Sequence, residues 1–184
     1  MAVRNCVMDD NEQGMFTVLG LARLRLTGPF WWHTDDIDEA NAKGAIFRAY
    51  REGDPMELAN VIVVDVTEDY TEPDVAQIQP DNVSSTDEAL KSGIIKDFEG
   101  RHLVLLEWMS SQLNEVRGLK ALVTAYTAND PSCGDRQFVA CRMNIHGKKI
   151  VLMCCFNISE AKLLAVPIFG VLKAMEIIPS AHIN

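Results

Sequence analysis

Alternating apolar and polar residues predict β-strands over the first third of this chain. Within residues 15–26, Leu24 and Leu26 alternate with Arg23 and Arg25, the period of two expected of a half-exposed strand. Two more strands are predicted at residues 45–50 and 57–66, and Gly53 and Pro55 mark the turn between them. The second of these has apolar residues on both faces, which is typical of a central strand.

The second half of the chain predicts a β-meander of four strands, at residues 102–111, 119–128, 136–145 and 149–157. The short "IHGK" connection before the last strand is typical of a tight hairpin turn, because Gly147 can adopt positive φ. In the last strand, Val151, Met153 and Cys155 face one side, and Ile150, Leu152, Cys154 and Phe156 the other. We therefore expect both faces of this strand to be covered.

Two helices are predicted around this meander. Ser85 and Glu88 have the spacing of a capping box, and Leu90, Ile94 and Phe98 form one stripe of a helix over residues 88–99 that Gly100 would end. A long C-terminal helix is predicted over residues 160–178, with Ser159 as its N-cap and Pro167 as a kink or break.

These elements predict an α+β fold in which helices pack on a mainly antiparallel sheet. With 184 residues and no repeat or linker, the chain is expected to form a single domain over residues 1–184, with residues 1–14 as a flexible N-terminal segment.

Composition excludes several classes of partner. The formal net charge of −9 argues against nucleic acid, whose phosphates require clustered Lys and Arg. The longest apolar stretch, near the C-terminus, is broken by Lys162, Pro167, Gly170 and Lys173, so no membrane span is expected. Five cysteines without CxxC spacing, and an N-terminus without an apolar run, predict reduced thiols and a cytoplasmic location.

No motif with catalytic or metal-ligand spacing is present. In "DDIDEAN" (residues 35–41), Asp36 and Asp38 fit the first two positions of a calcium loop, but Asn41 stands where glycine belongs. A solvated loop or a charged first helical turn is the favoured interpretation. His33, His102, His146 and His182 are widely spaced, so we expect no metal, no cofactor and no catalytic residues.

The adjacent Cys154 and Cys155 should point to opposite faces of a strand, and are interpreted as small buried hydrophobes. Cys133, in "NDPSCGD", is expected to be more exposed and more reactive. Trp31 and Trp32 close a strand before a polar loop, where one side chain should be buried and the other could meet a partner.

The order of elements resembles the Mog1/PsbP-like family. The likeness is strongest in "EWMSSQLNEVRGLKALVTAYTA", "DRQFVACRMNIHGKKIVLMCCF" and "SEAKLLAVPIFGVLKAMEI". The resemblance implies an α/β/α sandwich with a curved, mainly antiparallel sheet of six to seven strands, one helix mid-chain and a long C-terminal helix. It also implies a binding module that works through a sheet face or edge. The cytosolic branch of the family contains chaperones of type VI secretion effectors.

The leading hypothesis is a non-enzymatic protein-binding module, a cytosolic chaperone or adaptor for a secreted or membrane-active protein, working as a homodimer. It depends on the sheet being apolar on both faces and only partly covered by two helices. The candidate contact residues are aromatic or methionine: Trp31, Trp32, Trp108, Met143 and Met153.

Two alternatives remain open. One is an enzyme or small-molecule binder with a site between the sheet and the C-terminal helix, where His33 or His102 would lie beside Glu107 or Asp36. The other is an immunity protein that neutralises a toxin.

Overall fold

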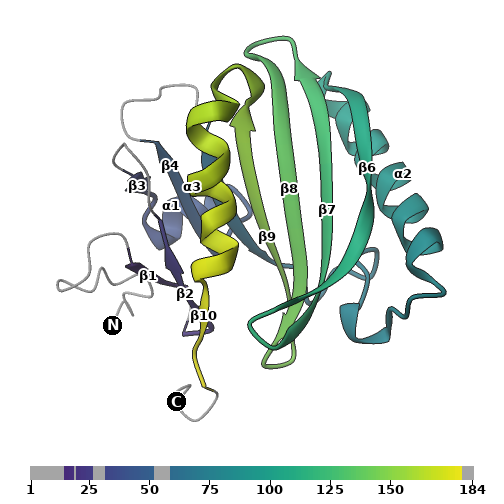
Figure 1. Ribbon diagram of the computed structural model, residues 1–184. Coiled ribbons are helices and arrows are strands. Elements are labelled where there is room, and N and C mark those ends of the chain that lie inside the picture. The colour runs from purple at the N-terminus through teal and green to yellow at the C-terminus, as the bar shows by residue number, and fades with distance from the viewer. Residues whose placement is uncertain (1–14, 19, 27–31, 52–58, 180–184) are drawn as a thin grey trace.

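A seven-stranded antiparallel sheet organises the computed structural model, which describes residues 15–18, 20–26, 32–51 and 59–179 (Figure 1). The strand order is β3-β4-β5-β9-β8-β7-β6. In chain order the strands are β3 (Trp32–Thr34), β4 (Phe47–Arg51), β5 (Asn60–Asp65), β6 (Val104–Val116), β7 (Leu119–Asp130), β8 (Gly134–Ile145) and β9 (Lys148–Asn157). The predicted α+β architecture is confirmed.

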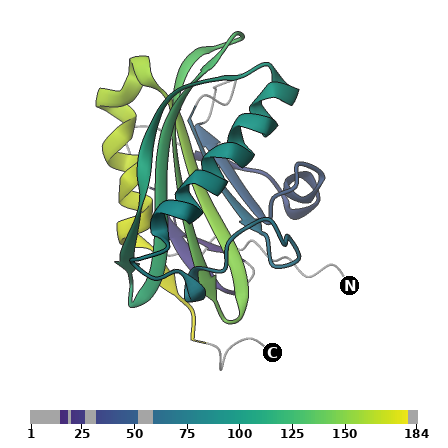
Figure 2. The same cartoon turned by 90° about the vertical axis from the view of Figure 1, so that its right-hand side faces the viewer.

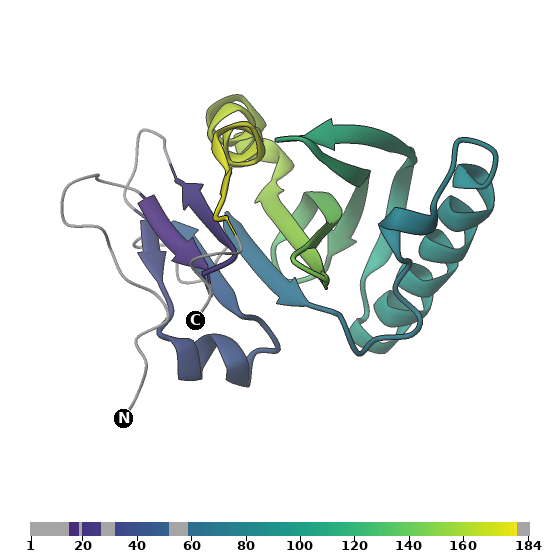
Figure 3. The ribbon, with the colours of Figure 1, turned by 90° about the horizontal axis from the view of Figure 1, so that it is seen from below.

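Helices lie on opposite sides of this sheet (Figure 2). The helix α3 (Ala161–Ala174) packs over β9 on one side, together with a second sheet of three short strands, β1 (Met15–Val18), β2 (Ala22–Arg25) and β10 (Glu176–Ile177). The helix α2 (Val83–Arg101) packs on β6 on the other side, near one end of the sheet (Figure 3). The largest apolar core lies on the α3 side, and two smaller clusters lie under α2.

The hairpin turns follow from local sequence. His146 and Gly147 both have positive φ (50° and 80°), as do Arg117 and Gly118 (53° and 78°), and such two-residue turns match the twist of antiparallel strands. The predicted "IHGK" hairpin between β8 and β9 is confirmed. The segment 112–116, which we predicted to be a connection, continues β6 up to its turn.

The predicted strand over residues 15–26 is a hairpin instead. Gly20 has φ +66°, and the Leu21 amide donates to the Val18 carbonyl at 2.8 Å, which folds β2 back onto β1. The alternation within β2 is as predicted, with Leu24 buried and Arg23 and Arg25 exposed.

The predicted capping box at Ser85 and Glu88 is wrong. The helix α2 begins earlier, at Val83, and the hydroxyl groups of Ser85 and Thr86 donate to the Asn82 carbonyl, both at 3.0 Å. It also runs through Gly100 and ends at His102, which has φ +59°. The left-handed residue that ends the helix is therefore a histidine and not the predicted glycine.

A capping box does form in the acidic run. The Glu39 amide donates to the Asp36 carboxylate at 2.9 Å, and the Glu39 carboxylate accepts from the Asp36 amide at 3.3 Å. This pair starts the short helix α1 (Ile37–Ala42), so the charged first helical turn that was one of the two interpretations of "DDIDEAN" is the one observed.

The C-terminal helix is shorter than predicted. It ends at Ala174, and the chain then leaves helical geometry so that Glu176 and Ile177 pair with Arg23 and Ala22 of β2. At the other end the predicted Ser159 N-cap is wrong, because Glu160 occupies the N-cap position of α3 and makes no side-chain cap bond. Asn157 instead caps the preceding 3₁₀ turn η2 (Ile158–Glu160), where its side chain accepts from the Ser159 amide at 2.9 Å. Among the described helices, none is long and apolar enough to cross a bilayer.

Candidate functional site

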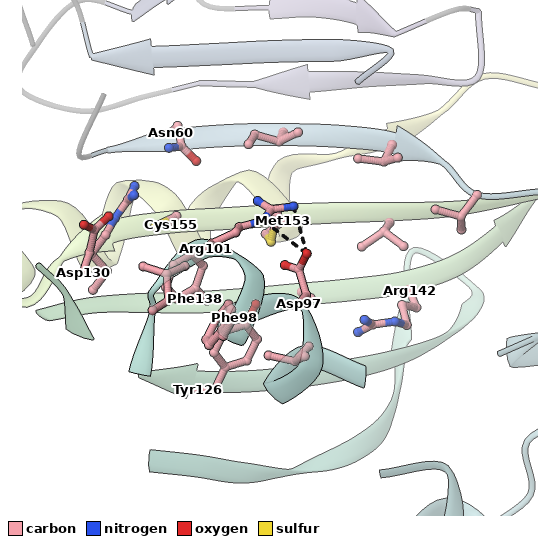
Figure 4. Close-up of a pocket in the computed structure, with 18 of the residues that line it drawn as sticks. Asn60, Asp97, Phe98, Arg101, Tyr126, Asp130, Phe138, Arg142, Met153 and Cys155 are labelled. Carbon is pink, nitrogen blue, oxygen red and sulfur yellow. Dashed lines mark hydrogen bonds and ion pairs between the residues drawn. The ribbon is translucent and has the colours of Figure 1, made fainter. Parts of the chain in front are cut away.

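A cavity of about 650 Å³ lies between α2 and the sheet face beneath it (Figure 4). Its lining comes from β5, β7, β8 and β9, from the second half of α2, and from Glu72 in the loop before α2. Another space, between β2 and the sheet beside Met175, which follows α3, has a volume of about 10 Å³. The predicted small-molecule site between the sheet and the C-terminal helix stays a prediction, since the side chains of residues 163–169 in that helix lie outside the described part of the chain.

The floor of this cavity, which we call the α2 hollow, is built from cross-strand rows. Because alternate residues share a face and the strands are antiparallel, each row contains residues that are register partners in neighbouring strands. Running from β7 through β8 and β9 to β5, the rows are Tyr126, Phe138, Cys155 and Asn60; Thr124, Ala140, Met153 and Ile62; and Leu122, Arg142, Val151 and Val64.

Aromatic side chains fill the end of the floor nearest the β7–β8 turn. Tyr126 stacks on Phe138 with centroids 5.0 Å apart and on Trp108 of β6 at 5.5 Å, in both cases with an interplanar angle of 12°. Phe98 of α2 meets the Tyr126 ring edge-on at 5.9 Å. Burial raises the pKa of the Tyr126 phenol, so this group stays neutral and acts as an apolar surface.

A buried ion pair closes the opposite end. Arg142 is 6% exposed, and its Nε donates to Glu72 Oε2 at 2.7 Å. Its Nη1 also reaches the Thr124 hydroxyl at 3.5 Å, which in turn shares a hydrogen bond of 2.8 Å with Ser111. The guanidinium thus holds the loop before α2 against the sheet, because a buried charge is stable only when it is paired.

The rim carries both signs of charge. Asp97 and Arg101 form an ion pair one turn apart on α2, at 3.1 Å (Figure 4). Across the hollow, a hydrogen bond from the Ser132 hydroxyl, aided by the nearby Arg136 guanidinium, lowers the pKa of the Asp130 carboxyl. Arg136 itself lies over the Phe138 ring, 5.5 Å from its centroid.

One carboxylate fixes α2 to the sheet. Asp87 accepts from the Ser111 amide at 2.7 Å and from the Trp108 indole at 3.1 Å. The register of β6 and β7 shifts between Met109 and Gln112, so this bulge turns the Ser111 amide toward the helix and away from the ladder. The helix α2 is therefore anchored over β6 and β7, and the β9 and β5 side of the floor stays open.

This opening leaves apolar side chains only partly covered. Ile62 and Val64 of β5, Met153 of β9 and Phe138 of β8 are all half-buried, whereas their neighbours facing α3, such as Val61 and Leu152, are fully buried. The sequence predicted a sheet that is apolar on both faces and incompletely covered. In the described residues, such incomplete cover is found on the α2 side, over β5 and β9.

The five residues predicted to contact a partner are scattered. Met153 lies in the floor of the hollow. Trp108 is half-buried, stacks on Tyr126, and lines a smaller groove on the outer side of α2. Met143 is 1% exposed in the α3-side core, and the half-buried Trp32 packs against that core. Trp31 lies outside the described residues.

The three histidines in the described residues do not gather at a site. The His33 ring lies against the Tyr50 ring, with centroids 5.1 Å apart and the planes tilted by 48°, and His102 ends α2; neither belongs to the lining of the hollow. Their proposed partners are elsewhere too, since Asp36 caps α1 and Glu107 is exposed on β6. The predicted pairing of a histidine with a carboxylate in a cleft is not found in the described part of the chain, where no group of three or more His, Cys, Asp or Glu could hold a metal.

The acidic run has a structural role at Asp35. This residue is 5% exposed, and its Oδ2 accepts from Arg48 at 2.7 Å and from Lys43 at 3.0 Å. Burial alone would raise the pKa of this carboxyl, but the hydrogen bonds from the two cations outweigh burial and lower it.

Cys154 and Cys155 face opposite sides of the sheet and are both buried, as predicted. Burial raises the pKa of Cys155, in the wall of the hollow, to about 12, and that of Cys141 to about 12. Thiols held this far from ionisation are poor nucleophiles.

Sequence reasoning missed the residues that define the hollow, above all Ile62, Phe138 and Arg142. The signal was present, because a two-residue turn at His146 and Gly147 dictates that Phe138 lies opposite Cys155. The Arg142 partner could not be found in this way, since Glu72 lies 70 residues away in a loop.

Comparison with known proteins defines the fold. No family model matches the chain, and no curated protein sequence matches it. Among solved structures, cyanobacterial PsbP (CyanoP) from Synechocystis sp. PCC 6803 superposes with a TM-score of 0.57 at 11% identity, covering 96% of this chain and 94% of CyanoP. LpqN of Mycobacterium tuberculosis, described as involved in cell envelope biogenesis, superposes with a TM-score of 0.52 at 13% identity, covering 95% and 90%. The chain therefore has the Mog1/PsbP-like fold that its sequence resembles.

Proposed function

We propose that this protein is a non-enzymatic binding module that holds an apolar segment of another protein in the α2 hollow, as a chaperone or adaptor. The observation that carries the proposal is the half-buried apolar floor formed by Ile62, Val64, Met153 and Phe138 beside a cavity of about 650 Å³. Contiguous apolar surface of this kind typically marks an interaction site in a soluble fold.

The dimensions of the hollow suit one helix. The part of the floor that α2 leaves open runs from β8 to β5, and two inter-strand spacings of about 4.8 Å give a width of roughly 10 Å. An α-helix with its side chains is about 10–12 Å across. An amphipathic helix would place its apolar face on the floor and its polar face between Asp97 and Arg101 on one rim and Asp130 and Arg136 on the other.

The chemistry of the lining supports binding more than catalysis. The Cys155 thiol is held neutral at ordinary pH, Arg142 is engaged by Glu72, and Asp97 by Arg101. General acid–base catalysis needs a group that gains and loses a proton near the working pH, and burial raises the pKa of the Cys155 thiol far above that range.

A small apolar molecule is the second candidate ligand. The volume of about 650 Å³ lies within the range of roughly 300–1,000 Å³ that is typical of small-molecule pockets. The stacked rings of Tyr126 and Phe138 would suit a flat apolar ligand. No separate observation favours the toxin-neutralising alternative.

The test compares two isoleucine variants. Ile62→Glu places a charge on the floor of the hollow, and Ile158→Glu places the same charge at an exposed isoleucine outside it. Binding of a fluorescein-labelled amphipathic helical peptide is measured by fluorescence anisotropy, and binding of bis-ANS by its emission. We expect Ile62→Glu to weaken peptide binding at least tenfold, since a charge buried on binding costs well over 1.4 kcal/mol.

A second variant removes the space without adding charge. Ala140 lies in the middle of the floor between Thr124 and Met153, so Ala140→Phe should fill the hollow and abolish peptide binding in a protein that remains folded by circular dichroism. A photo-crosslinking amino acid at position 153, with position 158 as control, then tests the native host. Peptide binding that is equal in all variants would overturn the proposal, and bis-ANS binding without peptide binding would favour the small-molecule candidate.

A further inference from the structure

A second apolar surface lies on the outer side of α2, away from the hollow. Of the six large apolar side chains that are exposed in the described residues, four belong to α2 or β6: Ile95 (37% exposed), Val104 (56%), Leu106 (53%) and Met109 (40%). Ile95, Val104 and Leu106 line one groove of about 430 Å³ between this helix and this strand. We call Lys91, Ile95, Glu99, Val104 and Leu106 the α2–β6 flank.

The flank is at the end of the main sheet. β6 pairs with β7 on one side and with no described strand on the other, and it is 13 residues long. A long edge strand with exposed apolar side chains offers a surface on which another chain can pack. Register shifts between Leu105 and Glu107 and between Met109 and Gln112 interrupt its ladder, so side chains and not a continued sheet would make the contact.

Ile95 lies midway between two opposite charges on α2. Lys91 lies one turn before it and Glu99 one turn after it, and all three are exposed on one stripe of the helix. Within the part of the chain that the structure describes, neither Lys91 nor Glu99 takes part in an ion pair. If two copies of α2 met antiparallel across a two-fold axis at Ile95, Lys91 of each would face Glu99 of the other.

The first residues of β6 lie at the level of the same axis. Ile95 lies about 10 Å along α2 from its C-terminal end, at 1.5 Å per residue. Because the chain returns alongside α2 at about 3.3 Å per residue, roughly three residues beyond Leu103 reach the same level, at Leu106. A two-fold axis through Ile95 therefore also brings Leu106 against its own copy.

We propose that the α2–β6 flank is the interface of a homodimer, in which a second copy of this chain covers Ile95, Val104 and Leu106. An isologous contact needs a surface that is complementary to itself, and a central apolar residue flanked by opposite charges at equal distances meets this requirement. The interface lies outside the α2 hollow, so both hollows of the dimer remain accessible.

A charge-swap series tests this arrangement. Lys91→Glu and Glu99→Lys should each place like charges opposite one another twice in the dimer, and we expect the dimer dissociation constant to rise about tenfold. The double variant K91E/E99K restores opposite charges and should return it to near the wild-type value. Sedimentation equilibrium over a range of concentrations measures the dissociation constant, and circular dichroism checks folding.

A disulfide tests the position of the axis. With Cys6 and Cys133 replaced by serine, Ile95→Cys should form a disulfide-linked dimer on oxidation, while Lys96→Cys, about 100° around the helix, should not. A wild-type protein that is monomeric at all concentrations would overturn the proposal. A dimer that both single charge reversals leave unchanged, or that crosslinks equally at position 96, would overturn it as well.

Discussion

At the scale of single residues, two buried charges in the described part of the chain are each paired with an opposite charge from another segment. Asp35 is held by Arg48, and Arg142 by Glu72, each at 2.7 Å. Each pair joins a loop to the sheet, because the loop residue finds its counter-charge on a strand. Removing one member of such a pair is costly, since the other charge stays behind in a site that water does not reach.

The first prediction concerns Asp35. Asp35→Asn keeps the shape of the side chain but removes the negative charge beside Arg48 and Lys43, so we expect the free energy of unfolding to fall by about 2–4 kcal/mol. Urea denaturation measures the change. Asp38→Asn, an exposed carboxylate in the first turn of α1, serves as the matched control and should change stability by less than about 0.5 kcal/mol.

The same pair predicts how the difference depends on pH. The pKa of Asp35 is lower in the folded protein than its ordinary value, so folding is favoured by its ionisation. Its contribution is complete above the unfolded pKa of about 3.9 and is lost as pH falls through the lower folded value. The stability gap between wild type and Asp35→Asn should therefore be constant near pH 7 and shrink below pH 4, and a gap that widens in acid would contradict this account.

At the scale of elements, a β-bulge and a helix are matched to each other. The bulge in β6 turns the Ser111 amide out of the ladder, and Asp87 of α2 accepts from it and from Trp108. These bonds fix the N-terminal half of α2 over β6 and β7. The C-terminal half of the helix is held by Phe98, which packs on Tyr126. The position of the helix, and with it the open side of the hollow, is set by these few contacts.

The second prediction tests this anchor. Asp87→Asn leaves only one acceptor oxygen and no charge, so α2 should open more often without global unfolding, with amide hydrogen exchange in residues 88–101 about tenfold faster. Glu88→Gln, exposed on the next position of the helix, is the control. Exchange in α2 that is unchanged by Asp87→Asn, or equally fast in both variants, would mean that apolar packing alone holds the helix.

At the scale of the whole molecule, the sheet separates two sides that differ in how completely apolar side chains fill them. The α3 side has one large core that includes Cys141 and Cys154, and the α2 side has two small clusters and the hollow, with Cys155 in its wall. Cys133 lies in the β7–β8 turn and is only half-buried. The four described thiols therefore lie in different places: on each side of the sheet and at one of its ends.

The third prediction uses these thiols. In the native protein, with Cys6 replaced by serine, a brief treatment with N-ethylmaleimide should modify the half-buried Cys133 and leave Cys141, Cys154 and Cys155 intact, because these three are buried away from the reagent. Mass spectrometry of peptides identifies the modified sites. In urea the three buried thiols should react together, in proportion to the unfolded fraction. Rapid modification of Cys155 alone in the native state would instead show that the hollow opens independently of the core.

The sequence by itself determined which segments are strands and how most of them are joined. Alternation along β8 and β9, and the turn residues His146 and Gly147, act over a few residues, so a local pattern was sufficient to predict them. The helices were predicted less well at their ends. The αL residue His102 and the departure of Glu176 toward β2 depend on neighbours far along the chain.

Only the tertiary structure decided which part of the sheet stays uncovered. Apolar residues at 62, 138 and 153 have the same pattern in the sequence as the core residues at 61, 139 and 152, since both faces of the central strands are apolar. The difference between them arises where α2 docks, through Asp87 and Ser111, which are 24 positions apart. Periodicity assigns a side chain to a face of its strand, but the coverage of that face depends on where other elements pack.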